Sequence, residues 1–472
     1  MVSEREIDSF IENHMDEMLS DLASLVEIES VQSAPEAGSP YGREVRRALD
    51  RALEIAGRLG LETCDGSGYV GFARLPGRQD TAGCLASISH VDVVPAGPGW
   101  HFDPFHMTVK DGWLIGRGTD DDKNAAVITL YAAKFLKEHG GLNHELRILL
   151  GCNEETGMHD IPHYVERYGE PAFCLVPDVF FPACNGEKGM YAASLQSCAL
   201  SGNLIDIKGG EAANAVPGSA SAKIRTAGPL PPGEHITIHA GNGMAELTAA
   251  GRGGHASEPE KTENAIGILV KYLLKNKLLS VREEKFFSLL GKVFADCHGA
   301  ALGIAAKDGI FGPLTCAGGT IRMADGKVTQ TIDIRYPLTA RGENIDAALR
   351  RLAGESDAVL TVDKSSAPFY VSPDSLPLQA CLRACNEVTG RSEKAEVIGG
   401  TTYARMFQHA IGFGMDDMSE KAPEFVGMLH GPDEGFSIRQ FKTALKIYIR
   451  AFLELDRLTY QSSCLHQVQY FH

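Results

Sequence analysis

The stretch Cys84-Leu-Ala-Ser-Ile-Ser-His90-Val-Asp92 decides the fold, because a short apolar run there ends in a histidine and a carboxylate. Such a run predicts a buried strand. Strand and helix patterns then alternate, with a helix expected at 124–137, a strand at 145–152 and a helix at 161–167. This alternation predicts a layered α/β sheet, and functional groups are expected where its strands end.

Outward from this sheet, the pattern changes twice along the chain. Two helices with apolar residues at helical spacing are predicted before it, at 4–29 and 43–59. Beyond Gly189, turn-rich strand patterns with helices near 263–276 and 282–294 predict an α+β domain. After a proline-bearing stretch, a helix is expected at 378–389 and the first pattern returns. The boundaries expected are therefore 1–188 and 372–472 for one domain, with 189–371 inserted, and a loose polar tail from about residue 459.

Composition narrows the function classes. A chain of 472 residues is long enough for two cores. Its 61 acidic and 45 basic residues give a formal charge of -16, which disfavours binding to nucleic acid and to anionic membranes. The acidic N-terminus does not resemble a secretory signal, and the eleven scattered cysteines are typical of reduced thiols. We therefore expect a cytoplasmic protein with no membrane helix.

Four more segments carry groups that bind metals. Asp120-Asp121-Asp122 precedes a predicted helix, Glu154-Glu155 ends a predicted strand, Asp178 follows an apolar run, and His430 lies in Gly427-Met-Leu-His430-Gly-Pro-Asp433-Glu434. Taken singly, each has an ordinary explanation, such as an acidic helix start or a solvated turn. Together with His90 they form a set of imidazoles and carboxylates that suits two divalent cations. Two cations sharing a carboxylate and a water favour hydrolysis.

Competing catalytic motifs are absent or lie in the wrong context. Gly66-Ser-Gly68-Tyr-Val-Gly71 matches the dinucleotide-binding pattern, but it enters a strand instead of a helix, and we interpret it as a turn. The sequence contains neither a G-x-S-x-G nucleophile elbow nor a Walker A loop. Metal-dependent hydrolysis is the chemistry that the remaining motifs favour.

Over nearly its whole length the sequence resembles the metallopeptidase-20 family, and most closely its bacterial dipeptidases. The resemblance rests on ordered motifs: His90-Val-Asp-Val-Val-Pro-Ala-Gly97, Arg117-Gly-Thr-Asp-Asp121, Glu154-Glu-Thr-Gly157, Pro177-Asp178 and Asn185-Gly-Glu-Lys-Gly189. It implies a zinc-peptidase-like α/β catalytic domain, a mixed sheet flanked by helices, formed by 1–188 and 372–472. The insertion 189–371 would be the α+β lid domain.

The resemblance also implies a ligand set for two metals. Asp121 would bridge them, His90 and Asp178 would complete one site, and Glu155 and His430 would complete the other. Zinc is the first expectation, with manganese or cobalt as alternatives, since this donor set accepts all three.

Further roles follow from the same resemblance. Glu154 would be the general base acting on a bridging water, and Asp92 would orient His90. His255, in Gly254-His-Ala-Ser257, would stabilise the oxyanion from the lid. The implied substrate-binding residues are Asn214 and Arg335 in the lid and Gly400 and Thr401 in a glycine-rich loop.

These inferences lead to an expected function with two alternatives. We expect a monomeric, metal-dependent dipeptidase that hydrolyses small unblocked peptides. An N-acyl-amino-acid deacylase or desuccinylase would use the same two-metal site. A non-catalytic metal-binding protein on the same fold is the other alternative, although such a protein would be expected to lack the base or a ligand, and Glu154 and the five ligand positions are present.

Overall fold

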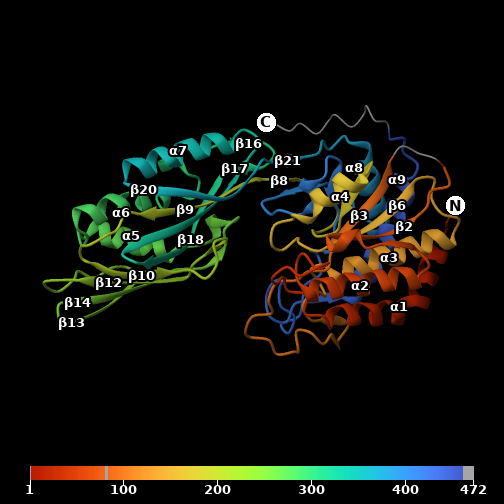
Figure 1. Ribbon diagram of the computed structural model, residues 1–472, viewed down its shortest axis with the longest axis horizontal. Coiled ribbons are helices and arrows are strands. Elements are labelled where there is room, and N and C mark those ends of the chain that lie inside the picture. The colour runs from red at the N-terminus through yellow and green to blue at the C-terminus, as the bar shows by residue number, and fades with distance from the viewer. Residues whose placement is uncertain (1, 80–82, 461–472) are drawn as a thin grey trace. The chain divides into compact units, whose positions relative to one another are not determined.

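The computed structural model describes residues 2–79 and 83–460, which form two compact units (Figure 1). One unit contains the described residues up to Gly186 together with 370–396 and 401–460. The other contains Glu187–Phe369 and Val397–Gly400. The polar tail expected from about residue 459 lies almost entirely outside the described residues.

The first unit is built on a mixed sheet in which strands β6, β3, β7 and β23 are consecutive, parallel neighbours. Since the carboxyl ends of parallel strands lie at the same edge of a sheet, residues that follow these strands converge. The predicted alternation of strand and helix is confirmed. Along the sheet the order is β1 (Glu62–Cys64), β2 (Val70–Leu75), β6 (Glu145–Gly151), β3 (Cys84–His90), β7 (Phe173–Val176), β23 (Ala410–Gly412), β8 (Cys184–Glu187) and β21 (Phe369–Tyr370), with β22 (Glu396–Ile398) paired to β8.

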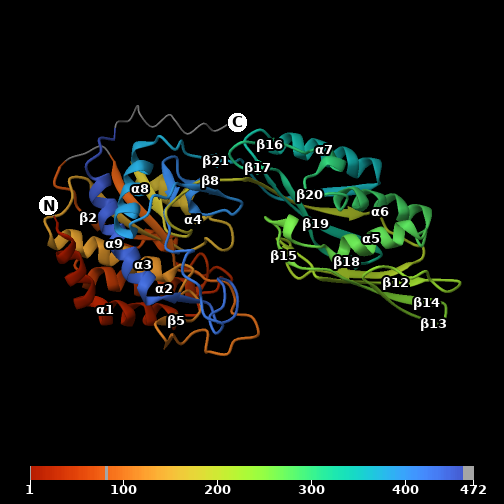
Figure 2. The ribbon, with the colours of Figure 1, turned by 180° about the vertical axis from the view of Figure 1, so that it is seen from behind.

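Helices flank this sheet, and α3 (Lys123–Glu138) lies directly against it. It contacts β3 and β6 on one side and both α1 (Glu4–Val26) and α9 (Ile438–Leu455) on another, as Figures 1 and 2 show. Most of its side chains are buried, as expected for a helix with apolar residues on all sides. The remaining helices of this unit are α2 (Arg43–Arg58), α4 (Asp160–Tyr168), α8 (Leu376–Thr389) and the 3-10 turns η1 (Gly66–Gly68) and η4 (Tyr403–Met406). A small sheet contains β4 (Thr108–Lys110), β5 (Trp113–Ile115) and β24 (Gly435–Ser437).

The second unit is an antiparallel sheet with helices packed on one face. Side chains alternate between the two faces, so that Ile332 and Ile334 join the apolar core with the helices while Asp333 and Arg335 point to the opposite face. The strand order is β13 (Ile236–Gly241), β14 (Met244–Ala250), β12 (Ser219–Arg225), β10 (Leu204–Gly209), β18 (Thr315–Ala324), β19 (Lys327–Tyr336), β9 (Gly189–Ser197) and β20 (Ala358–Ser366). The helices are α5 (Ala265–Lys275), α6 (Val281–Val293) and α7 (Gly342–Glu355), with η2 (Pro259–Lys261) and η3 (Ala300–Leu302). Two short strand pairs complete the unit: β11 (Ala215–Val216) with β15 (Gly254–His255), and β16 (Lys307–Asp308) with β17 (Gly312–Pro313).

Several predicted helices and one predicted turn are confirmed. The helices expected at 4–29, 43–59, 263–276, 282–294 and 378–389 correspond to α1, α2, α5, α6 and α8. The glycine-rich segment that begins at Gly66 forms the turn η1 before β2. In the part of the chain that the structure describes, the ten cysteines are free thiols, and no helix combines the length and apolar character needed to cross a bilayer.

One buried carboxylate connects the end of α9 to the start of β6. Asp456 accepts hydrogen bonds from the backbone amides of Asn143 and His144, both at 2.8 Å. Replacing Asp456 with Ala leaves these amides without a partner, and we expect the free energy of unfolding to fall by about 1–3 kcal/mol in a urea titration. Asp456→Asn keeps one acceptor oxygen and should lose less. Equal losses in the two variants would contradict this explanation.

Candidate metal centre

The ends of three neighbouring strands bring the sequence-predicted ligands together. His90 is the last residue of β3, Glu155 lies four residues beyond β6, and Asp178 lies two residues beyond β7. Asp121 precedes α3, whose first turn packs close to the same edge, and the peptide between Asp121 and Asp122 is cis. The loop before β24 supplies His430. These five residues therefore come from five different segments of the chain.

Two groups of possible metal ligands share Asp121. One contains His90, Asp121 and Asp178, the other Asp121, Glu155 and His430, and within each group one ligand atom per residue lies within 4.8 Å of the others. Asp121 Oδ1 is 2.8 Å from His90 Nε2, and Asp121 Oδ2 is 2.8 Å from His430 Nε2. Each oxygen of this carboxylate thus belongs to a different group, which is the arrangement that a carboxylate bridging two cations requires.

Hydrogen bonds set the tautomer of His90 and the position of Glu154. The Nδ1 atom of His90 lies 2.9 Å from the backbone oxygen of Asp92, which only accepts, so Nδ1 carries a proton and Nε2 is left as a possible metal ligand. The Asp92 carboxylate is 3.6 Å from the same Nδ1. It accepts hydrogen bonds from the amides of Glu154 at 3.3 Å and Glu155 at 3.2 Å. Asp92 therefore contacts both the histidine and the segment that carries the expected base.

The carboxyl groups of the candidate centre are buried close together, and their pKa values are shifted as a result. Burial, together with the carboxylates of Asp121 and Glu154, raises the pKa of Asp178. Burial also raises the pKa of Glu154, to which Glu155 and Asp121 add, against the effect of His90. For Asp121 itself, burial acts in the same direction, but the hydrogen bonds from His430 and His90 outweigh it and lower its pKa. Divalent cations fit this donor set, because they would offset the repulsion between these carboxylates.

A buried ion pair fixes the loop that carries Asp121. Glu434 Oε1 accepts hydrogen bonds from the amides of Gly118 at 2.8 Å and Asp121 at 3.3 Å, while its Oε2 pairs with the guanidinium of Arg117. Arg117 in turn donates to the backbone oxygen of His430 at 3.2 Å. Since Arg117 and Glu434 are 1% and 0% exposed in their side chains, this pair is shielded from water and links the two ligand-bearing loops.

The remaining sequence-predicted site residues lie mainly in the second unit. His255 pairs with Ala215 across β11 and β15, next to Asn214, whose backbone oxygen accepts a hydrogen bond from Ala256 at 2.9 Å. The exposed His255 ring lies 2.6 Å from the hydroxyl of Ser257. The structure thus brings Asn214 and His255 together on one local strand pair.

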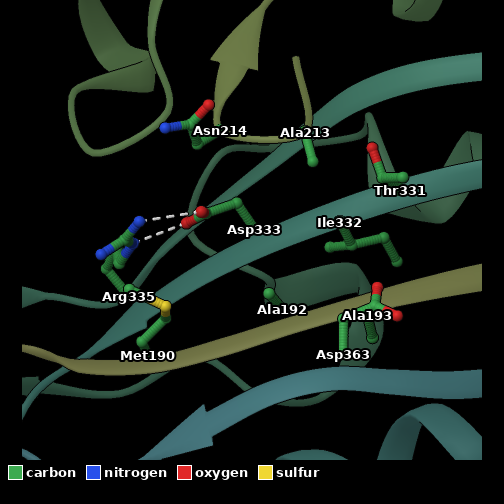
Figure 3. Close-up of a pocket in the computed structure, with 10 residues that line it drawn as sticks. All are labelled: Met190, Ala192, Ala193, Ala213, Asn214, Thr331, Ile332, Asp333, Arg335 and Asp363. Carbon is green, nitrogen blue, oxygen red and sulfur yellow. Dashed lines mark hydrogen bonds and ion pairs between the residues drawn. The ribbon is translucent and has the colours of Figure 1, made fainter. Parts of the chain in front are cut away.

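Arg335 and Asn214 line a pocket on the face of the sheet opposite the helices (Figure 3). The pocket has a volume of about 210 Å³. Asp333 holds the Arg335 guanidinium through two hydrogen bonds, of 2.7 and 2.9 Å. Arg335 also donates to the backbone oxygen of Gly399 at 3.2 Å, which places the expected glycine-rich loop with Gly400 beside it. The hydroxyl of Thr401, next in the chain, is buried without a hydrogen-bond partner among the described residues.

Sequence reasoning gave no role to Arg117, Glu434 or Asp333. Arg117 lies in the motif that contains Asp121, and Glu434 lies in the segment that contains His430. However, a single sequence does not indicate that residues 317 positions apart form an ion pair. Asp333 had a usable signal, because residues two apart on a strand share a face and a carboxylate there can pair with Arg335.

The chain is similar to proteins of a known peptidase family. The model of peptidase family M20/M25/M40 matches residues 86–454. The chain belongs to this family. The matched range contains all five candidate metal ligands and the segments around Glu154 and His255.

Relatives in the M20 family match almost end to end. The Bacillus subtilis protein YtjP, provisionally named a dipeptidase, is 30% identical over 471 residues, covering 94% of this chain and 98% of the relative. The Beta-Ala-Xaa dipeptidase of Lactobacillus delbrueckii subsp. lactis is 28% identical over 467 residues, covering 94% and 96%. Among solved structures, human carnosine dipeptidase 1 has the same fold with a TM-score of 0.63 and 17% identity, covering 96% of this chain and 99% of that one.

Removing the carboxylate of Glu434 should disturb both stability and metal binding. Glu434→Ala leaves the buried guanidinium of Arg117 unpaired, and we expect the free energy of unfolding to fall by about 3–5 kcal/mol. Because the Asp121 loop loses its anchor, metal affinity should weaken by roughly ten- to a hundredfold in a chelator competition assay. Glu424→Ala, a change to an exposed carboxylate, is the control. A folded Glu434→Gln variant with unchanged metal affinity would show that the pair does not position Asp121.

Proposed function

We propose that the protein is a metal-dependent dipeptidase that hydrolyses the peptide bond of small unblocked peptides. The observation that carries the proposal is the pair of ligand groups that share Asp121, with Glu154 directly before one of the ligands, Glu155, in the chain. The nearly full-length similarity to a Beta-Ala-Xaa dipeptidase supports the substrate class. Membership of a peptidase family supports hydrolysis of an amide bond.

The ligands of the proposed metals are the five residues of the two groups. His90 and Asp178 would hold one divalent cation, Glu155 and His430 the other, and Asp121 would contact both. Zinc is the first candidate, with manganese or cobalt as alternatives, because imidazole and carboxylate donors accept all three. Such cations, when bound, polarise a carbonyl and lower the pKa of a water.

Glu154 is the proposed general base. Its carboxylate would accept a proton from the attacking water and return that proton to the nitrogen of the leaving amine, so that both proton transfers use one group. Asp92 fixes the backbone at Glu154 and Glu155. In this proposal Asp92 therefore positions the base and also orients His90.

Residues of the second unit are proposed to recognise the substrate. Arg335 and Asn214 would bind its terminal carboxylate, a task suited to a guanidinium whose plane is already held by Asp333. His255 would donate a hydrogen bond to the oxyanion that forms at the scissile carbonyl. Gly400 and Thr401 would line the substrate site. The proposal assigns bond cleavage to one unit and recognition to the other.

A substrate panel tests the reaction class. Release of free amino acids is measured from dipeptides, N-acetyl amino acids and N-succinyl-diaminopimelate, with chelator-treated enzyme and added zinc or manganese. We expect cleavage of dipeptides only when metal is restored. Cleavage restricted to the N-acyl compounds would identify a deacylase instead, and no turnover with any metal would favour a non-catalytic binding protein.

Substitution of the base should separate chemistry from metal binding. In Glu154→Gln the side chain keeps its size but no longer accepts a proton, and we expect kcat to fall by at least about a hundredfold. Zinc affinity should change little, because Glu154 belongs to neither ligand group. Glu166→Gln, an exposed position on α4, is the matched control. Near-normal kcat in Glu154→Gln would exclude this residue as the base.

Substitution of Arg335 should act on substrate binding. Lysine keeps the charge but not the planar fork, so Arg335→Lys loses the two-point contact with Asp333 and with a substrate carboxylate. We expect KM for dipeptides to rise roughly ten- to a hundredfold, with a smaller change in kcat. Steady-state kinetics at saturating metal would measure both constants. A fall in kcat with constant KM would contradict the recognition role.

We further propose that the enzyme works as a monomer in the cytoplasm. Cysteines scattered singly through the chain are typical of a reducing compartment. The large inserted segment, Glu187–Phe369, supports the monomer, because dimeric members of the family are expected to use a shorter one. Light scattering of the purified protein measures the oligomeric state, and a mass twice that of the chain would overturn this part of the proposal.

A further inference from the structure

The second unit contains a cluster of metal-binding groups that the proposed peptidase reaction does not use. Glu260 on η2 and the adjacent Cys297 and His298, in the loop between α6 and η3, each place one ligand atom within 4.8 Å of the others. None of the three belongs to the metal centre described above. The donors are a carboxylate, a thiol and an imidazole, a combination suited to zinc.

The loop that carries Cys297 and His298 is held in place by a dense set of hydrogen bonds. The carboxylate of Asp296 accepts from the amides of His298 at 2.8 Å, Ala300 at 3.0 Å and Ala301 at 3.2 Å. The backbone oxygen of Cys297 accepts from the amide of Cys316 on β18 at 2.8 Å. The backbone that carries the two ligand side chains is therefore held in place without an ion.

A hydrogen bond also selects the tautomer of the neutral His298 ring. Its Nδ1 lies 2.9 Å from the backbone oxygen of Leu314, which only accepts, so Nδ1 carries the proton. Nε2 is then the atom with a lone pair, and it lies 3.7 Å from Cys297 Sγ. Two ligands on a tetrahedral zinc, at the usual zinc–sulfur and zinc–nitrogen distances, are about 3.5 Å apart. A backbone carbonyl that holds the other ring nitrogen is a common feature of metal-binding histidines.

The third donor, Glu260, is placed to complete a three-residue site. Its Oε1 lies 4.0 Å from His298 Nδ1, the ring nitrogen that bonds to Leu314, so the Glu260 side chain has to rotate toward Nε2 to join a cation there. Its side chain is 43% exposed, which leaves room for this rotation. Because His298 is also 41% exposed, water can reach the cluster and occupy a fourth position. Three protein ligands with one open position are a known zinc geometry.

We propose that Glu260, Cys297 and His298 form a third cation site, specific for zinc or similarly thiophilic divalent ions. Binding replaces the thiol proton of Cys297 with the metal and releases that proton to solvent, so the charges balance. Hard cations such as magnesium and manganese bind weakly here, because a thiolate is a poor ligand for them. The site is independent of the proposed peptidase reaction, since it shares no ligand with the metal centre.

Cobalt provides a specific probe of this site. A cobalt–thiolate bond gives a charge-transfer absorption in the near ultraviolet, and the ligands proposed for the metal centre include no sulfur. We expect the full-length protein titrated with Co²⁺ to develop this band, and Cys297→Ser to lose it. Cys198→Ser, which changes another half-buried cysteine of the same unit, should keep it. Absence of the band in the unaltered protein, or its persistence in Cys297→Ser, would overturn the proposal.

Zinc stoichiometry gives a second, independent readout. In equilibrium dialysis the unaltered protein should bind one more equivalent of zinc than the His298→Ala variant. The circular dichroism spectrum of the variant should match that of the unaltered protein, because the His298 side chain is partly exposed. Glu260→Gln should weaken this equivalent without removing it. Equal stoichiometry in the parent and a folded His298→Ala would refute the site. These results do not depend on turnover, so they stand apart from the test of peptidase activity.

Discussion

The candidate metal centre is organised around one buried carboxylate, that of Glu434, which accepts hydrogen bonds from backbone amides of the loop that carries Asp121. Asp121 contributes an oxygen to each ligand group, so any movement of this loop would alter both groups together. The pairing of Glu434 with Arg117 neutralises its charge and connects it to the backbone at His430. Segments far apart in the chain are thereby held at one edge of the sheet.

Around this anchor, the first unit concentrates negative charge that it does not neutralise fully with its own side chains. Asp92, Glu154 and Asp178 all have pKa values raised by burial, which means that their ionised forms are destabilised without a cation. Asp121, with a histidine at each oxygen, instead has a pKa lowered by its neighbours. The close packing that destabilises the ionised carboxylates without a cation would stabilise a bound divalent ion. Metal binding would therefore add to the stability of the fold.

Much of the fold, and the convergence of metal-binding groups at strand ends, could be predicted from sequence because local patterns indicate both. The assignment of individual metal ligands came from the family resemblance. The apolar runs before His90 and Glu154 are short and continuous, and parallel pairing of the strands that they form brings their ends together. The helical spacing in α3 is an equally local pattern. No local sequence pattern indicates the contact of Arg117 with Glu434 or the proximity of Glu260 to Cys297. In each case the two residues are far apart in the chain and meet only in the folded structure. The roles given to the five metal ligands, to Glu154 and to the substrate-binding residues stay predictions that kinetics and metal analysis can decide. The domain boundaries with their functions also stay predictions.

The pairing of Arg335 with Asp333 has a consequence for the substrate recognition proposed above. A lone arginine in a pocket exerts a long-range pull on anions that dissolved salt screens strongly. Here the positive charge is already balanced by a carboxylate at 2.7 and 2.9 Å, so a substrate carboxylate would be held by short, directional hydrogen bonds and not by the net field of the pocket. Recognition of this kind depends on the shape and spacing of the substrate's end group, and it changes little between dilute buffer and the ionic strength of a cell.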